Sequence, residues 1–156
     1  MGAGKTTVGK KLAQRLGYLF IDTDMEIEKE QGCSISEIFK YAGEECFRDL
    51  ETEILQKLQS KQNLVIATGG GMVLRDKNRN LMQSLGTRVY LQVELQELMR
   101  RLKKDKKRPL LQKSKPEELI LEMLQKRKHI YEEAECIIET TDLSPQQMVT
   151  EIIRKI

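Results

Sequence analysis

Four short segments of the chain are apolar at nearly every position, and longer stretches of mixed polar and apolar residues separate them. Strands with one solvated face alternate between apolar and polar residues, whereas continuous short apolar runs are typical of parallel strands covered on both faces. The pattern therefore predicts buried parallel strands. They are expected at Tyr18–Asp22, Leu64–Thr68, Arg88–Val93 and Cys136–Glu139.

The stretches between these strands are helix-like, and cap residues mark two of their starts. Ser34 has Glu37 three residues later, as a capping box requires, and Ser144 is followed by Pro145 at the first helical position. The alternation predicts an α/β fold, in which helices cover both faces of a parallel sheet and ligands bind beyond the carboxyl ends of the strands. The predicted helices are Lys5–Leu16, Asp24–Gln31, Ser34–Tyr41, Glu44–Gln59, Lys77–Leu85, Glu94–Lys103, Pro116–Glu133 and Ser144–Lys155.

Length and composition agree with one soluble globular domain that spans residues 1–156. Of the 156 residues, 39% are hydrophobic and 33% are charged, and no apolar run is long enough to cross a bilayer. The formal net charge is +3 and no basic stripe is interleaved with aromatics, so small anionic ligands are expected rather than nucleic acid or a membrane. Three well-separated cysteines without metal-ligand spacing are expected to be reduced thiols of a cytoplasmic protein: Cys33, Cys46 and Cys136.

The segment Gly2-Ala3-Gly4-Lys5-Thr6-Thr7 matches the second half of a phosphate-binding loop, G-x-x-x-x-G-K-[ST]. Glycines let backbone N–H groups approach a polyphosphate, and the helix that follows adds its positive N-terminal end. In such a loop Lys5 reaches the β- and γ-phosphates, Thr6 binds Mg²⁺ and Thr7 lies near the α-phosphate. Taken alone, the half-motif is equally compatible with a glycine-containing helix start that binds no ligand.

Asp22 and Asp24 follow the first predicted strand directly. Carboxylates at positions i and i+2 of an extended chain project to the same side, and their mutual repulsion favours a cation or a polar substrate beside them. One aspartate could hold Mg²⁺ through water while the other orients a substrate hydroxyl. An N-cap role for the helix that starts at Met25 would explain Asp24 alone, but not the pair.

Three consecutive glycines, Gly69, Gly70 and Gly71, follow the second predicted strand. Three glycines in a row cost more conformational entropy than a turn requires. Close approach of the backbone to a small ligand is the interpretation we favour, because the loop leaves the carboxyl end of a buried strand. A flexible loop without a ligand is the alternative.

Three basic features complete the candidates. Arg48 has Glu51 three residues later, within reach to orient it, and Arg127 lies on a later predicted helix. Singly, each arginine is typical of a solvent-exposed helix charge, but together they would clamp a carboxylate. The basic segment Lys103–Leu111 contains Arg108 and is either a solvated loop or the lid of a phosphoryl-transfer site.

The motifs G-A-G-K-T-T, F-I-D-T-D, F-R-D-L-E, A-T-G-G-G, R-P-L-L and K-R-x-x-x-Y occur in this order, and together they resemble shikimate kinase from Met1 to the C-terminus. The resemblance implies a three-layer P-loop kinase fold with five parallel strands in the order 2-3-1-4-5. It implies a monomer that transfers the γ-phosphoryl group of ATP to the 3-hydroxyl of shikimate, on the route to aromatic amino acids. Residues of about 24–60 would form the shikimate-binding helical region and about 103–115 the lid.

The resemblance also assigns roles to individual residues. Lys5, Asp24 and Arg108 would be catalytic, with Arg108 as the lid arginine at the phosphates. Thr6 and Asp22 would hold Mg²⁺. The remaining assignments are shikimate binding by Asp24, Arg48, Gly69, Gly70, Gly71 and Arg127, and nucleotide binding by Gly2, Ala3, Gly4, Lys5, Thr6, Thr7, Arg101, Arg108 and Pro145. The adenine match is looser, since Asp142-Leu143-Ser144-Pro145 lacks the flanking basic residue often found there.

The first glycine of the phosphate-binding motif and the family's first strand would both lie upstream of Met1, so strand 1 is expected to be missing from the sequence given. Its neighbours, Leu64–Thr68 and Arg88–Val93, would then each lack a backbone partner on one side. Two alternatives remain: a P-loop kinase of another small hydroxy acid such as gluconate, or a truncated relative that binds ligand without catalysis.

Overall fold

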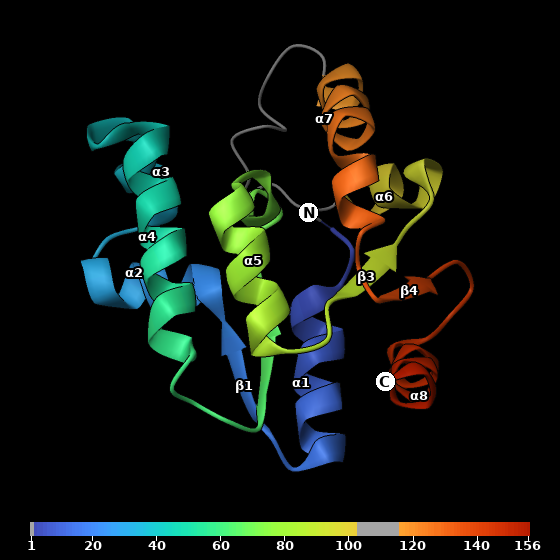
Figure 1. The fold of residues 1–156 in the computed structure, drawn as a ribbon. Coiled ribbons are helices and arrows are strands. Elements are labelled where there is room, and N and C mark those ends of the chain that lie inside the picture. The colour runs from blue at the N-terminus through green and yellow to red at the C-terminus, as the bar shows by residue number, and fades with distance from the viewer. Residues whose placement is uncertain (1, 103–115) are drawn as a thin grey trace. The chain divides into compact units, whose positions relative to one another are not determined.

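A computed structural model describes residues 2–102 and 116–156, which divide into two compact units (Figure 1). The first unit spans Lys5–Thr87, and the second contains residues 2–4 and 88–156. None of the helices within the described residues is long and apolar enough to cross a membrane.

The Lys5–Thr87 unit is built on two parallel strands, β1 and β2, whose register runs from Leu19↔Leu64 to Asp22↔Ala67. Both strands therefore end at the same edge, where Asp22 and the glycine loop begin. Six other elements belong to the same unit. The bounds are α1 (Lys5–Leu16), β1 (Leu19–Asp22), α2 (Thr23–Gln31), α3 (Ile35–Tyr41), α4 (Gly43–Leu58), β2 (Leu64–Ala67), the 3₁₀ turn η1 (Met72–Leu74) and α5 (Asp76–Leu85).

Helix α1 packs against both strands of this unit, with Val8 and Leu12 buried. Gly9 permits the close approach, because a Cβ built there would lie 2.6 Å from Cε2 of Phe20 in β1. A second apolar cluster joins α2, α3 and α4 and so holds the helix that carries Arg48. Its fully buried members are Ile27, Ile38, Phe47, Ile54 and Leu58.

The second unit contains another parallel pair, β3 and β4, in register from Val89↔Cys136 to Gln92↔Glu139. Helix α8 packs on β4 with Met148, Val149 and Ile152 buried, and Leu98 of α6 packs against Ile120 of α7. The bounds are β3 (Val89–Gln92), α6 (Leu95–Leu102), α7 (Pro116–Tyr131), β4 (Cys136–Glu139) and α8 (Pro145–Lys155).

These elements confirm the predicted parallel α/β fold, with every predicted strand found and helix ends shifted by at most two residues. The pairs β1–β2 and β3–β4 match the neighbours 2-3 and 4-5 of the expected order, although the described residues form two two-stranded sheets rather than one. Both predicted caps are present, and Ser34 and Ser144 each form a capping box. The sequence pattern did not predict η1, which is only three residues long.

One alternative from the sequence is wrong. Helix α2 begins at Thr23, so the N-cap position belongs to Asp22, and Asp24 lies inside the first turn. The side chain of Asp22 makes no capping hydrogen bond. Neither aspartate is therefore explained by helix capping.

Candidate functional site

The end of β1 and the first turn of α1 bring Thr6 and Asp22 together. The Thr6 hydroxyl donates a hydrogen bond of 2.8 Å to Asp22 Oδ2. A hydroxyl and a carboxylate side by side suit Mg²⁺, which binds few protein oxygens and completes its shell with water and substrate phosphates. Among residues 2–102 and 116–156, no group of three or more His, Cys, Asp or Glu could hold a metal ion. The two residues that the sequence assigned to Mg²⁺ therefore meet and fit that ion chemically.

The backbone before α1 has the conformation that a phosphate-binding loop needs. Gly2 and Gly4 have φ angles of 71° and 84°, in the left-handed region that favours glycine. Lys5 is the first residue of α1, and Thr6 and Thr7 follow in its first turn, so the helix N-terminus lies directly after the glycines. Backbone amides at such a terminus attract anions.

Arg48 is nearly buried on α4, and two glutamates of the same helix hold its guanidinium. Nη1 donates to Glu51 Oε2 at 2.7 Å, and Nη2 donates to Glu44 Oε1 at 2.9 Å. Arg48 is 9% exposed and Glu51 is fully buried, whereas the side chain of Glu44 is 60% exposed. The predicted orienting role of Glu51 is confirmed, and the alternative of a solvent-exposed Arg48 is wrong.

Burial and pairing act in opposite directions on these charges. Burial raises the pKa of Glu51 above its ordinary value and outweighs the hydrogen bond from Arg48, which lowers it. Asp24 adds to the rise in the pKa of Glu51 by like-charge repulsion. Burial lowers the pKa of Arg48, but its bonds to Glu51 and Glu44 raise the pKa above the ordinary value overall. Arg48 thus stays cationic.

The glycine loop after β2 lies close to the side chains of Asp24, Arg48 and Glu51. A Cβ built on Gly71 would touch Nη1 of Arg48 and lie 2.6 Å from Nη2. A Cβ built on Gly69 would lie 2.7 Å from Asp24 Oδ1 and 2.9 Å from Glu51 Oε1. Gly71 has φ −94°, which any residue can adopt, so close approach rather than backbone strain requires glycine there.

Thr23, between the two aspartates, ties the start of this loop to α2. Its buried hydroxyl accepts a bond of 3.3 Å from Gly69 N and donates one of 3.4 Å to Ala67 O. The motif D-T-D had indicated roles only for its two carboxylates, so Thr23 was not predicted as a site residue. Glu44 and the buried Asn78 were not predicted either. Their positions could have indicated Thr23 and Glu44, since Thr23 is adjacent to both aspartates and Glu44 lies one helical turn before Arg48.

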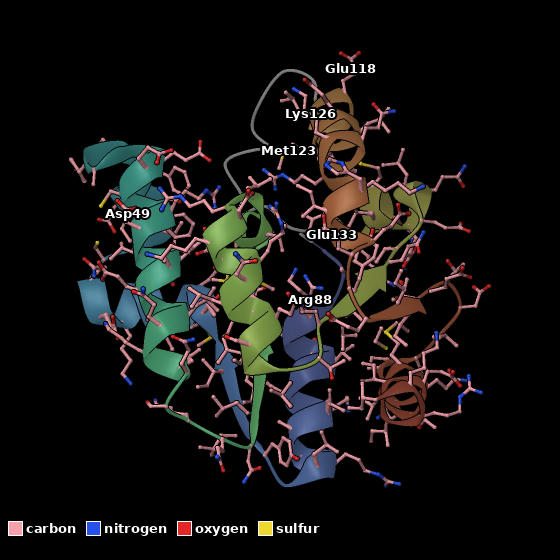
Figure 2. The ribbon with its side chains drawn as sticks, viewed as in Figure 1. Asp49, Arg88, Glu118, Met123, Lys126 and Glu133 are labelled. Atoms are coloured by element: carbon pink, nitrogen blue, oxygen red, sulfur yellow. The ribbon has the colours of Figure 1, made fainter. Side chains whose placement is uncertain are left out.

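The structure does not bring all predicted site residues into one unit. Arg101, Arg127 and Pro145 belong to the unit of residues 88–156. There Arg101 Nε donates to Glu97 Oε1 at 2.7 Å, Pro145 begins α8, and Arg127 lies on α7 with Met123 and Lys126 (Figure 2). Arg108 and the predicted lid of about 103–115 lie outside the described residues.

The Lys5–Thr87 unit therefore collects a guanidinium, the buried carboxyl group of Glu51, the half-buried carboxyl group of Asp24 and a stretch of glycine backbone at the carboxyl edge of its strands. The members of this group are Asp24, Arg48, Glu51, Gly69, Gly70 and Gly71. Arg48 supplies charge and paired N–H donors for a carboxylate, and Asp24 supplies an acceptor for a hydroxyl. Such a set suits a small hydroxylated acid.

Comparison with known proteins identifies close relatives over the whole chain. A sequence model described as "SKI: Shikimate kinase" matches residues 1–156. The shikimate kinase of Persephonella marina is 45% identical over 156 residues, which cover 100% of this chain and 94% of that protein. The shikimate kinase of Thermodesulfovibrio yellowstonii is 46% identical over 155 residues, which cover 99% of this chain and 90% of that protein.

Solved structures agree with the sequence relatives. Shikimate kinase from Acinetobacter baumannii in complex with shikimate superposes with a TM-score of 0.93 and 41% identity, over 99% of this chain and 87% of that chain. Shikimate kinase from Aquifex aeolicus gives a TM-score of 0.86 and 37% identity, over 99% of this chain and 90% of that chain. The similarity therefore extends to the arrangement of the backbone.

Proposed function

The chain belongs to the shikimate kinase family, and on that premise we propose that it transfers the γ-phosphoryl group of ATP to the 3-hydroxyl of shikimate. The observation that carries this proposal is the convergence of Arg48 and Asp24 on the glycine loop, where a carboxylate and a hydroxyl of one small molecule could be bound together. The product, shikimate 3-phosphate, serves aromatic amino acid biosynthesis.

For substrate binding, we assign the shikimate carboxylate to Arg48 and Arg127 and the 3-hydroxyl to Asp24. The buried bond from Arg48 to Glu51 at 2.7 Å fixes the guanidinium in one orientation, which reduces the entropy lost when substrate binds. Gly69, Gly70 and Gly71 would line the shikimate site, because a side chain at the first or last of them would collide with Asp24 or Arg48. Arg127 is assigned by the family motif alone.

For nucleotide binding, we assign the phosphates to residues 2–7. The helix N-terminus and the two glycines with positive φ support this assignment, and Lys5 would neutralise the β- and γ-phosphates. Thr6 and Asp22 would hold Mg²⁺, which supplies charge neutralisation and alignment of the phosphates when it is bound. Arg101 and Pro145 remain our assignment for the adenine, and Arg108 for the lid.

In the reaction, the shikimate 3-hydroxyl oxygen forms a bond to the γ-phosphorus while the bond from that phosphorus to the β,γ-bridging oxygen breaks. The proton of the hydroxyl passes to Asp24 or to solvent, and ADP leaves with the bridging oxygen. A loose phosphoryl transition state requires alignment and charge neutralisation more than a strong base. Asp24 therefore acts mainly by aiming the hydroxyl, and Lys5 and Arg108 by stabilising negative charge on the phosphoryl oxygens.

We further propose that residues 1–156 act as one kinase domain, with a shikimate-binding region at about 24–60, and that the protein works as a cytoplasmic monomer. Family resemblance supports the monomer, and the unpaired thiols of Cys33, Cys46 and Cys136 are compatible with a reducing compartment. Sedimentation equilibrium of the purified protein tests the monomer, since a mass of two chains would contradict it.

The activity is tested by following ADP release with shikimate and, separately, with gluconate as acceptor. We expect turnover with shikimate only. Lys5→Met should abolish transfer, because the lysine neutralises phosphate charge, whereas Lys10→Met on the exposed face of α1 is the matched control and should retain it. Turnover with gluconate instead would favour the other small-acid kinase.

Isothermal titration with ATP and with shikimate distinguishes an active kinase from a truncated relative that binds its ligands without catalysis. Binding of both ligands by a parent protein that shows no turnover would identify a non-catalytic relative. A fully active Lys5→Met variant would contradict the phosphate-binding loop itself.

A further inference from the structure

We propose that Asn78 is a positioning residue of the shikimate site, because its buried side chain ties the end of the glycine loop to the helix that carries Arg48. The proposal rests on the proposed function for its ligand. Asn78 lies in the first turn of α5 and is fully buried, although asparagine is usually exposed. Its side-chain hydrogen bonds join Met72 and Thr52, neither of which was assigned to substrate binding.

Both ends of the Asn78 amide are bonded, and they reach different elements. Nδ2 donates a hydrogen bond of 3.0 Å to the carbonyl oxygen of Met72, the residue directly after Gly71. Oδ1 accepts a bond of 2.7 Å from the hydroxyl of Thr52 on α4. One amide thus links the 3₁₀ turn that ends the glycine loop to α4 through α5.

The α4 end of this link lies one helical turn from Arg48. The Thr52 hydroxyl is also 3.0 Å from the carbonyl oxygen of Arg48, so its single proton lies between two acceptors. Thr52 is 6% exposed, which leaves these polar atoms little access to water. Loss of Asn78 would leave the Thr52 hydroxyl with the Arg48 carbonyl alone and the Met72 carbonyl without this donor.

The hydrogen bond from Asn78 to the Met72 carbonyl fixes the position of Gly71 next to the guanidinium of Arg48. A Cβ on Gly71 would lie 2.6 Å from Arg48 Nη2, so there is no free space between the loop and this side chain. The turn after it is short, and its bonds Met72 N→Gly69 O and Leu74 N→Gly71 O are 3.3 and 3.0 Å. Thr23 holds the start of the loop, and Asn78 holds its end.

Neighbouring residues brace the same corner from outside. Arg79 donates to the carbonyl oxygen of Val73 at 2.8 Å, next to the carbonyl that Asn78 binds. Arg75 reaches α4 and pairs with Asp49 and Glu45, each at 2.6 Å; Asp49 is labelled on that helix in Figure 2. The side chains of Arg75 and Arg79 are 28% and 23% exposed, whereas Asn78 is fully buried, so water competes more with these outer contacts than with the bonds of the amide.

The direct test compares Asn78→Ala with Asn80→Ala, a matched control on the exposed face of α5. Loss of the buried amide should raise the shikimate Kd and KM by about tenfold, because one buried hydrogen bond is typically worth that much. The KM for ATP should change by less than about twofold. A folded Asn78→Ala variant with the parent's shikimate Kd, or with ATP and shikimate affected equally, would overturn the proposal.

A second pair of variants covers the case in which Asn78→Ala does not fold. Thr52→Val removes the hydroxyl at constant shape and should weaken shikimate binding in the same direction, whereas Thr52→Ser keeps the hydroxyl and should restore most of the affinity. Equal shikimate affinity of the valine and serine variants would contradict the link.

Hydrogen exchange of the unliganded protein separates failure of this proposal from failure of the proposed function. The amides of Met72 and Leu74 should exchange faster in Asn78→Ala or Thr52→Val than in the parent, whatever the substrate is. Unchanged exchange there would refute the tether. A parent that binds no shikimate, with faster exchange in the variants, would refute the function and the ligand assignment but leave the tether standing.

Discussion

At the scale of single residues, Glu51 is the buried partner of the Arg48 guanidinium. The carboxyl group of Glu51 is fully buried and receives Nη1 of Arg48 at 2.7 Å, whereas Glu44 binds the same guanidinium from the solvent side. A buried charge that loses its partner keeps its desolvation cost, but an exposed partner can be replaced by water. The two glutamates should therefore differ in energetic weight.

This difference predicts the stabilities of two variants. Glu51→Ala should lower the free energy of unfolding by about 3 kcal/mol, because it leaves Arg48 partly buried without its inner partner. Glu44→Ala is the matched control, one turn earlier on α4, and should lower it by less than about 1 kcal/mol. Urea unfolding at neutral pH measures the free energy of unfolding of both variants. Equal decreases would show that burial does not determine how much each glutamate contributes to stability.

The candidate site was predictable from sequence where the chemistry is local. Two aspartates after one strand and three glycines after another could be predicted as site residues, because parallel strands end at one edge of the sheet. Asn78 gave no such signal: it is one polar residue among several on α5, and its role depends on Met72 and Thr52. Hydrogen bonds across 26 positions of the chain cannot be inferred from periodicity.

At the scale of elements, Arg88 and Glu135 clasp the starts of β3 and β4. Arg88 Nη2 donates to Glu135 Oε1 at 2.7 Å, and the Arg88 amide donates to Oε2 at 2.9 Å (Arg88 is labelled in Figure 2). Since Val89 and Cys136 are the first pair of the ladder, this contact sits where the strand register begins. The hydrogen bond from Arg88 lowers the pKa of Glu135 from 4.5 to about 2.

The clasp predicts a specific loss of stability in acid. A folded-state pKa below the unfolded value stabilises the protein above pH 4.5, and the stabilisation disappears as the pH falls from 4.5 to about 2. Glu135→Gln should therefore have a shallower dependence of unfolding free energy on pH in this window than the parent. Urea titrations at several acidic pH values measure the slope.

The control for this comparison is Glu151→Gln, which removes a carboxylate from an ion pair within α8. That pair joins residues three apart on one helix and fixes no strand. The slope of Glu135→Gln is compared with the slopes of this variant and of the parent. If Glu135→Gln keeps the parent's slope, the Arg88 contact does not couple to folding.

Helices and strands were predicted most accurately from the sequence where a local signal, such as a cap residue, agreed with the apolar pattern. The cap at Ser34 was marked by Glu37 three positions later, the cap at Ser144 by the following Pro145, and the four strands by continuous apolar runs. The turn η1 was not predicted because it is only three residues long, too short for a periodic pattern, and its backbone bonds run to glycines of the preceding loop.

At the scale of the whole molecule, the family assignment rests on the shikimate kinase model that matches residues 1–156 and on relatives at 45% and 46% identity. The half phosphate loop, D-T-D and G-G-G are individually weak signals, and only their order along one α/β chain indicates the same family from sequence. The proposed kinase also needs a cation at the transferring phosphoryl group from the segment of about 103–115, which lies outside the described residues. That requirement rests on the sequence alone.

Arg108→Ala should lower kcat by about 100-fold or more while the shikimate Kd, measured by isothermal titration, stays close to that of the parent. The asymmetry is expected because negative charge on the phosphoryl oxygens is redistributed only in the transition state, whereas the proposed contact between the shikimate carboxylate and Arg48 would already be made in the ground state. Lys107→Ala removes one positive charge from the adjacent position and serves as the matched control. Equal kcat for Arg108→Ala and the parent would remove the lid role from this arginine. If Arg108 acts through one positioned guanidinium, the neighbouring lysine cannot take over its role, and the two variants should differ in kcat. An equally large loss of kcat in Lys107→Ala would instead assign the effect to the net charge of the segment.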